Sequence, residues 1–260
     1  MTVEVSVEKI TPKKAASMLN ANHNNRRLRE GVAEQYAADM RAGKWTVCTA
    51  PIAFYDDGDL ADGQHRLWAI VESDFSTTFT IMRGLPRQAG LNIDTGAPRT
   101  LVDNAKISGM NDDLSNELLG VVRAFATGDR TTGRLSNSQR LDLIAKHGDE
   151  ARWAIAHGTR GRNLHNVCVT AAIARAYVYE GNHERLAEFG QVLSTGYGNG
   201  EGDTAAITLR NKLIETSGVP TKAWRETFLK VQNCIYYFMR HRKLTVLKSV
   251  KDEQYPLKQK

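Results

Sequence analysis

The sequence predicts an α+β protein, with a small mixed α/β domain over residues 1–109 and an all-helical domain over residues 110–260. Two observations support this division. Short runs rich in β-branched and aromatic residues, separated by turn formers, occur in the first part. In the second part, apolar residues recur at helical spacing. A chain of 260 residues is long enough for one large domain or two small ones.

The first elements follow from alternation and from helix-capping residues. Residues 3–7 alternate valine with polar residues, which predicts a short strand. Thr11-Pro12 has the composition of an N-cap followed by a first helical residue, so a helix is expected to run to about residue 20. Apolar residues on one face of segment 32–40 predict a second helix, which ends at Gly43.

The clearest local pattern is a hairpin that leads into a helix and a further strand. A strand, hairpin, helix and strand within some thirty residues form a small α/β unit. The expected elements are a strand over 51–55, a turn over 56–59, a return strand over 60–61, a helix over 65–73 and a strand over 77–82.

Helices are expected throughout the second part. Their predicted ranges are 114–125, 136–147 with a stop at Gly148, 167–179, 184–193, 205–215 and 222–242. The glycine-rich segment 196–202 is expected to be a flexible loop.

Composition indicates a soluble protein of a reducing compartment. Hydrophobic residues make up 41% of the chain, yet no run approaches the roughly 18–20 apolar residues that a membrane-spanning helix needs. The N-terminus lacks the pattern of a signal peptide. Cys48, Cys168 and Cys234 are widely spaced and odd in number, which is typical of buried free thiols in a reducing cytoplasm.

The net charge of +6 is concentrated at the C-terminus. Residues 1–110 hold 13 Lys/Arg and 13 Asp/Glu, residues 111–219 hold 12 and 13, and residues 220–260 hold 10 and 3. Such a basic end favours binding to a polyanion such as DNA, and a solvated helix face with a frayed end is the alternative. The candidate DNA-binding residues are Lys222, Arg225, Lys230, Arg240, Arg242, Lys243 and Lys248. The aromatic residues of this segment recur at helical spacing, so most of them are expected in the core.

The segment Asp62-Gly63-Gln64-His65-Arg66 is the strongest candidate for a functional site. It lies where a strand leads into a helix, and helix N-termini bind anions through unpaired N–H groups. Gly63 lets the backbone approach a ligand, Arg66 suits bidentate contact with phosphate, and His65 suits donation or proton transfer. Asp62 suits either an N-cap or a ligand of Mg²⁺. A packed structural His65 and an Arg66 paired with a hairpin aspartate are the alternatives.

Residues 51–70 resemble the core of the ParB/sulfiredoxin superfamily, in which a strand-hairpin leads into a Gly-x-His-Arg or Gly-Glu-Arg-Arg turn on a helix. The pentapeptide is similar to the signature of the DGQHR-type branch, which includes proteins tied to DNA modification systems. The chain also resembles ParB-like proteins of bacteriophages and actinobacteria, which implies the cytoplasm of a bacterium, or of its host if a phage encodes the chain. The resemblance covers roughly residues 5–105.

The resemblance implies a ParB/sulfiredoxin-like N-terminal domain that binds ATP, ADP or CTP. Gly63, His65 and Arg66 match the phosphate-binding turn, and Gln64 stands where sulfiredoxins carry cysteine, which argues against peroxiredoxin repair. Residues 92–99 stand where ParB proteins have a second motif, and residues 25–27 stand where they have an arginine-bearing segment. The phosphate-binding residues implied are Gly63, Gln64, His65, Arg66, Thr95, Arg99, Arg26 and Arg27. The catalytic residues implied are Asp62, His65, Arg66 and Asp94, with Asp62 and Asp94 as Mg²⁺ ligands.

Three functions remain open at this point. The first is an ATP- or CTP-dependent phosphotransferase or NTPase that acts on or with DNA. The second is a non-catalytic DNA-binding protein or transcriptional regulator. The third is a ParB-like nuclease, which needs clustered carboxylates such as Asp56, Asp57 and Asp59, although aspartates in a hairpin usually form turns. A homodimer is also left open.

Overall fold

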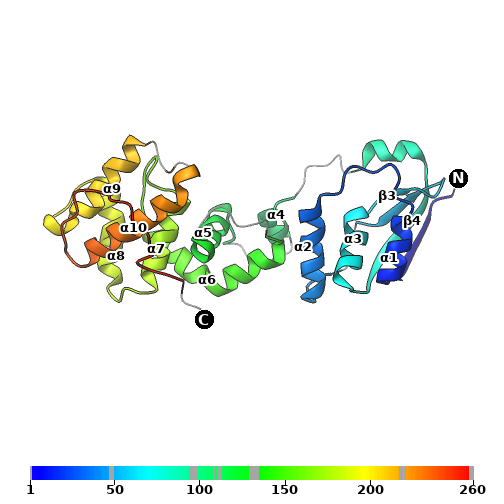
Figure 1. The fold of residues 1–260 in the computed structure, drawn as a ribbon, viewed down its shortest axis with the longest axis horizontal. Coiled ribbons are helices and arrows are strands. Elements are labelled where there is room, and N and C mark those ends of the chain that lie inside the picture. The colour runs from blue at the N-terminus through cyan, green and yellow to red at the C-terminus, as the bar shows by residue number, and fades with distance from the viewer. Residues whose placement is uncertain are drawn as a thin grey trace. The chain divides into compact units, whose positions relative to one another are not determined.

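The computed structural model is a mixed α+β protein with one small four-stranded sheet and, in the described ranges, ten α-helices (Figure 1). This confirms the predicted α+β class. The structure describes residues 2–46, 50–93, 99–107, 109, 113–128, 135–216, 219 and 221–257. The predicted boundary near residue 109 lies beside residues 108 and 110–112, which are outside these ranges.

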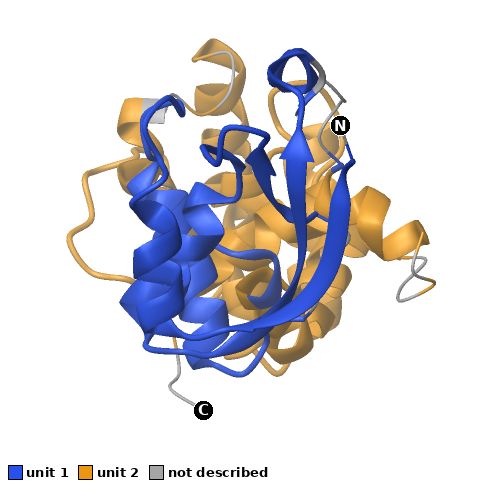
Figure 2. Ribbon diagram, turned by 90° about the vertical axis from the view of Figure 1, so that its right-hand side faces the viewer, with its two compact units in different colours: residues 1–99, 134–138 blue, residues 100–133, 139–260 orange. Residues whose placement is uncertain are grey.

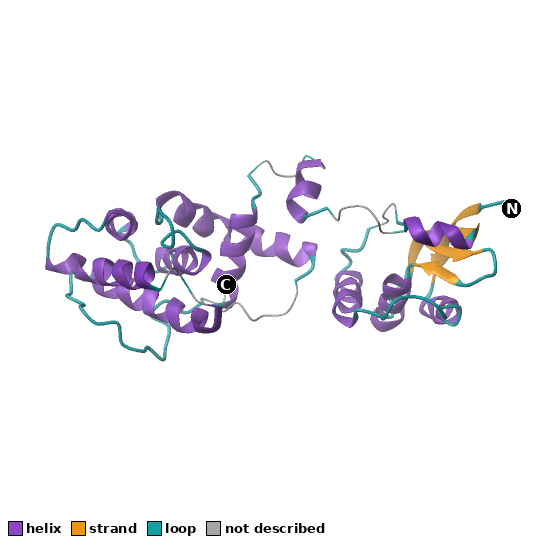
Figure 3. Cartoon of the chain, turned by 90° about the horizontal axis from the view of Figure 1, so that it is seen from above, coloured by secondary structure: helices purple, strands orange, loops and turns teal. Residues whose placement is uncertain are grey.

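The chain divides into two compact units (Figure 2). Unit 1 comprises residues 1–99 and 134–138, and unit 2 comprises residues 100–133 and 139–260. Figure 3 shows that the strands belong to the N-terminal part of the chain and that the rest of the described chain is helices and loops.

Unit 1 contains the sheet, three α-helices and a 3-10 helix. Its elements are β1 (Glu4–Ile10), α1 (Pro12–Leu19), α2 (Glu30–Arg41), β2 (Ile52–Tyr55), β3 (Leu60–Asp62), α3 (Gln64–Ser73), β4 (Thr77–Leu85) and η1 (Arg87–Asn92). The strand order is β1-β4-β2-β3, with β2 parallel to β4 and the other neighbours antiparallel. The predicted strands and helices of this half are therefore confirmed, including the N-cap at Thr11, whose side chain accepts a hydrogen bond from the Lys14 N–H.

The sheet buries the face that carries the polar residues of β1. Ser6 and Glu8 lie on the same face as the buried Ile81 and Phe79 of β4, whereas Val5 and Val7 are 62% and 72% exposed. Glu8 is tolerated there because Lys14 and Arg83 both pair with its carboxylate. Hydrogen bonds from Arg83 and Lys14 lower the pKa of Glu8 to about 2.

Unit 2 is built from helices. Its elements are α4 (Leu101–Ile107), α5 (Asn116–Thr127), α6 (Asn137–His157), which begins in unit 1, α7 (Val167–Tyr177), α8 (His183–Thr195), η2 (Glu201–Asp203), α9 (Thr204–Glu215), η3 (Thr221–Ala223) and α10 (Trp224–Met239). The predicted end of a helix at Gly148 is wrong, because α6 continues to His157. A glycine inside a helix costs only about 1 kcal/mol, and the fully buried Ala151 and Ala154 anchor the following turns.

The segment that follows α10 packs against the helices of unit 2. The aromatic and aliphatic residues predicted to lie in the core of α10 are buried, with Phe228, Ile235 and Phe238 at 0% exposure. Beyond that helix, Tyr255 is 2% exposed, its hydroxyl donates to Glu180 Oε1 at 2.7 Å, and its N–H donates to Gln232 Oε1 at 3.0 Å. The segment that ends at Tyr255 is therefore held to the helices and is not frayed.

Cys168 and Cys234 are buried free thiols, as predicted, and Cys48 lies outside the described residues. In the part of the chain that the structure describes, none of the helices combines the length and apolar character that crossing a bilayer demands.

Candidate functional site

The Asp62–Arg66 turn forms where β3 ends and α3 begins. Gly63 is the N-cap of α3 and has a φ of 110°, a backbone conformation that residues with a side chain rarely adopt. A Cβ atom at this position would lie 3.1 Å from Ile52 Cγ1 and 3.3 Å from Ile52 Cα. Gly63 is therefore required both by its backbone conformation and by its close packing on β2.

The Arg66 side chain connects this turn to the residues that precede β2. Its guanidinium donates to the carbonyl oxygens of Ala50 at 2.6 Å and Pro51 at 2.9 Å, and to Asp62 Oδ2 at 2.8 Å. Only 8% of Arg66 is exposed. Asp62 also accepts a hydrogen bond from the Gly63 N–H through its other oxygen at 2.6 Å. These contacts join the start of β2 to the first turn of α3.

Gln64 attaches the preceding arginine-bearing loop to the turn. Its side-chain amide donates to the carbonyl oxygen of Arg26 at 2.8 Å and accepts from Asn22 at 3.2 Å. Asn25 adds a bond to the carbonyl oxygen of Leu60 at 2.6 Å. The buried Gln64 thus holds the chain around Arg26 beside the first turn of α3.

His65 is a hydrogen-bond acceptor at the edge of the turn. Its Nε2 accepts from the backbone N–H of Arg29, the N-cap residue of α2, at 3.0 Å. An accepting Nε2 carries no hydrogen, so the neutral ring has its proton on Nδ1. Burial lowers the pKa of His65, and the positive charges of Arg26 and Arg29 lower it further. Arg66 acts in the same direction, and Asp62 opposes it.

A cationic pocket of about 510 Å³ opens at this turn, within unit 1. This volume lies in the range of roughly 300–1,000 Å³ that is usual for small-molecule sites. The cationic side chains that line it are Arg26, Arg29, Lys44 and Arg66. The other lining residues are Val32, Tyr36, Asp39, Trp45, Thr46, Ala50, Asp62, Gly63, His65, Asn137 and Ser138. Arg27 lies outside this pocket and lines a neighbouring hollow with Arg26 and Arg29.

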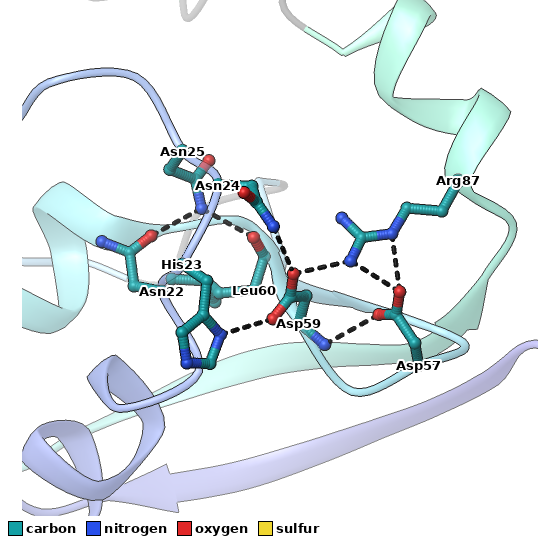
Figure 4. Close-up of polar contacts among 8 residues, drawn as sticks. All are labelled: Asn22, His23, Asn24, Asn25, Asp57, Asp59, Leu60 and Arg87. Carbon is teal, nitrogen blue, oxygen red and sulfur yellow. Dashed lines mark hydrogen bonds and ion pairs between the residues drawn. The ribbon is translucent and has the colours of Figure 1, made fainter.

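Two aspartates of the β2–β3 hairpin, Asp57 and Asp59, are engaged in a separate polar cluster (Figure 4). Arg87 pairs with both Asp57 and Asp59, and Asp59 also contacts His23 and Asn24. Hydrogen bonding from Arg87, then from His23 and Asn24, holds the pKa of Asp59 well below its usual range. These carboxylates therefore stabilise the hairpin and the loop at residues 22–25.

Of the two predicted magnesium ligands, only Asp62 lies among the described residues. The described residues contain no group of three or more His, Cys, Asp or Glu that could hold a metal ion. Both carboxylate oxygens of Asp62 accept hydrogen bonds, from Gly63 and from Arg66. Asp94 and Thr95 lie outside the described residues. Arg99 is exposed and lines none of the pockets described above.

Four of the seven candidate DNA-binding cations form ion pairs with carboxylates. Their pairs are Arg225 with Glu253, Lys230 with Glu226, Arg240 with Glu180, and Lys243 with Glu201. Arg240 and Arg242 also lie over the rings of Tyr236 and Tyr237. Lys222, Arg242 and Lys248 are exposed and make no ion pair with other residues that the structure describes.

Most of the pocket residues were not among the sequence candidates, and Lys44, Asp39 and Ser138 belong to this group. For Arg29, as for Arg26 and Arg27, the sequence alone favours a solvated basic loop. The sequence carries a weak signal for Arg29, because it follows Arg26 and Arg27 closely. It carries none for Ser138, which is remote in sequence and reaches the pocket only through tertiary structure.

Comparison of the chain with models of protein families, with curated proteins and with solved structures finds no match. Any statement about function therefore rests on the geometry of this site.

Proposed function

We propose that unit 1 binds a nucleotide, whose phosphates occupy the cationic pocket, and that the protein uses the bound nucleotide in phosphoryl-transfer or NTPase chemistry on or with DNA. The convergence of Arg26, Arg29 and Lys44 on one pocket beside His65 carries this proposal. The pKa of His65 agrees with it, because burial and then the positive charges of Arg26 and Arg29 lower that pKa. A site that disfavours one more positive charge is suited to an anion. The resemblance of residues 51–70 to the core of the ParB/sulfiredoxin superfamily also supports this proposal.

The side chains of the pocket divide into two roles. Arg26 and Arg29 are exposed and offer guanidinium groups that suit bidentate contact with phosphate oxygens. Arg66 is buried and already donates to two carbonyl oxygens and Asp62. We therefore assign phosphate contact to Arg26 and Arg29, and support of the turn to Arg66. The neutral His65 offers Nδ1–H as a further donor.

Isothermal titration with ATP, CTP and their diphosphates tests this proposal. Removing one guanidinium contact with a charged group costs about 1.5–3 kcal/mol, so Arg29→Ala should weaken nucleotide binding by roughly 10- to 100-fold. Arg41→Ala is the matched control, since Arg41 also belongs to α2 but pairs with Glu72 outside the pocket. Equal nucleotide affinities of the Arg29 variant and the control would contradict the assignment of Arg29 to phosphate contact.

Catalysis is separated from binding by measuring phosphate release from the nucleotides that bind. The phosphotransferase or NTPase proposal expects release or transfer of phosphate, whereas a DNA-binding protein that uses nucleotide as a switch would show neither. We do not propose a nuclease, because Asp57 and Asp59 are engaged with Arg87.

We further propose that unit 2 contacts DNA through its unpaired cations. A contact with one phosphate contributes about 0.9 to the slope of log affinity against log salt concentration. Replacing three such cations by alanine should therefore lower the slope by about 3, whereas Lys230→Ala should change it little because Lys230 pairs with Glu226. An unchanged slope for the triple variant would contradict the proposal. The three residues are Lys222, Arg242 and Lys248.

A further inference from the structure

A hydroxyl–carboxylate pair lies in the wall of the cationic pocket. The Ser138 hydroxyl donates to Asp39 Oδ1. Asp39 lies on α2, and Ser138 lies in the first turn of α6, within the part of that helix that belongs to unit 1. Both residues line the same pocket as Arg26 and Arg29.

This pair has the geometry of a nucleophile and its base. A hydroxyl hydrogen that is directed at a carboxylate is ready to be transferred as the oxygen attacks. The Ser136 hydroxyl donates to the same oxygen of Asp39 at 2.7 Å and so fixes the carboxylate. Ser136 is buried, whereas Ser138 is partly exposed and lines the pocket. Ser138 is therefore the hydroxyl within reach of a ligand.

We propose that Ser138 accepts a phosphoryl group from a nucleoside triphosphate bound in this pocket, so that the protein phosphorylates itself. This inference rests on the proposed function and names the acceptor of the phosphoryl group. Ser138 Oγ attacks the γ-phosphorus and forms the new P–O bond. The bond between that phosphorus and the β–γ bridging oxygen breaks, and the nucleoside diphosphate leaves with the electron pair. The hydroxyl proton passes to Asp39 and then to water.

Positive charge around Ser138 favours the transfer and offsets the repulsion between the product phosphate and the Asp39 carboxylate. Arg26 and Arg29 supply positive charge beside the transferring group, which is the main contribution of a protein to this chemistry. The product places a phosphate on the second residue of α6, a helix of 21 residues. A phosphate in the first turn of a helix is stabilised by the helix dipole and by nearby arginines.

The test is to incubate the full chain with ATP or CTP and Mg²⁺, and to measure phosphate incorporation by intact mass and by mapping of the modified residue. We expect one phosphoryl group per chain on Ser138. Ser138→Ala should carry none, and Ser138→Thr, which keeps a hydroxyl, should be modified. Asp39→Asn should slow the transfer by roughly 10²- to 10⁴-fold, the usual contribution of a general base.

Ser115→Ala is the control, because Ser115 also lies at the start of a helix, where it accepts a hydrogen bond from the Leu118 N–H, but it lies outside the pocket. This variant should be phosphorylated as the parent protein is. Circular dichroism establishes that each variant is folded.

Nucleotide affinity, measured on the same samples, separates this inference from the proposed function. If nucleotide binds and no phosphoryl group appears, or if it appears on another residue, Ser138 is not the acceptor and the pair serves only to join α6 to α2. If no nucleotide binds, the proposed function itself is wrong.

Discussion

The replacement of Arg66 by alanine tests the division of roles within the pocket. Arg66 makes three hydrogen bonds of 2.6 to 2.9 Å, two to carbonyl oxygens and one to Asp62. Breaking a buried ion pair costs about 3–5 kcal/mol. The Asp62 side chain is 31% exposed, so the lower end applies. We expect Arg66→Ala to lower the free energy of unfolding by about 3 kcal/mol.

Urea unfolding followed by circular dichroism measures this loss, and titration calorimetry measures nucleotide binding on the same protein. The companion variant is Arg29→Ala, whose exposed side chain should contribute less than about 0.5 kcal/mol to stability but should be needed for binding. The reasoning would be refuted if Arg66→Ala kept the parental unfolding free energy and lost nucleotide affinity. Arg66 would then be a ligand group and not a support of the turn.

Three further predictions concern the turn and the segment after α10. Gly63→Ala should lower the free energy of unfolding by about 2–3 kcal/mol, because backbone strain and the contact with Ile52 add. Gly58 has a φ of 87° but no neighbour within 4 Å, so Gly58→Ala should lower it by only about 1 kcal/mol. Equal losses in urea unfolding would contradict the account. The folded pKa of His65 lies below its ordinary value of 6.5, so its contribution to the free energy of unfolding should be fully present above pH 6.5 and fall as the pH drops toward the folded pKa. The His65→Gln variant should lose less stability over that range. Identical pH profiles of the two proteins would argue against a neutral His65. Tyr255→Phe removes the bond to Glu180 and should lower the free energy of unfolding by about 1 kcal/mol in thermal or urea unfolding, whereas no loss would show that the segment after α10 is not held by this contact.

Local patterns made much of the fold predictable. The N-cap at Thr11, the hairpin before Leu60 and the helix that follows Gly63 depend on neighbouring residues, and the structure confirms them. Gly148 shows where local reasoning fails. Its low helix propensity predicts an end, but the packing of the following turns outweighs a cost of about 1 kcal/mol.

The candidate site was predictable in position but not in the roles of its residues. The sequence marks the turn through Gly63, whose positive φ and close packing on Ile52 only glycine satisfies. It does not reveal that Arg66 points toward the carbonyl groups before β2 or that Gln64 holds Arg26. Those directions depend on the pairing of β2 with β4 and on the path of the loop before α2, both of which are tertiary features.

The most direct test of the central claim is an NMR titration of the His65 ring in the presence and absence of nucleotide. A phosphate group beside Arg26 and Arg29 would offset the positive charge that now lowers the pKa of His65. The account predicts a lowered pKa in the free protein that rises when ATP or CTP binds. Nucleotide that binds without moving this pKa, or a saturating concentration that leaves all resonances of the pocket unchanged, would contradict the claim that the Asp62–Arg66 turn is a phosphate site.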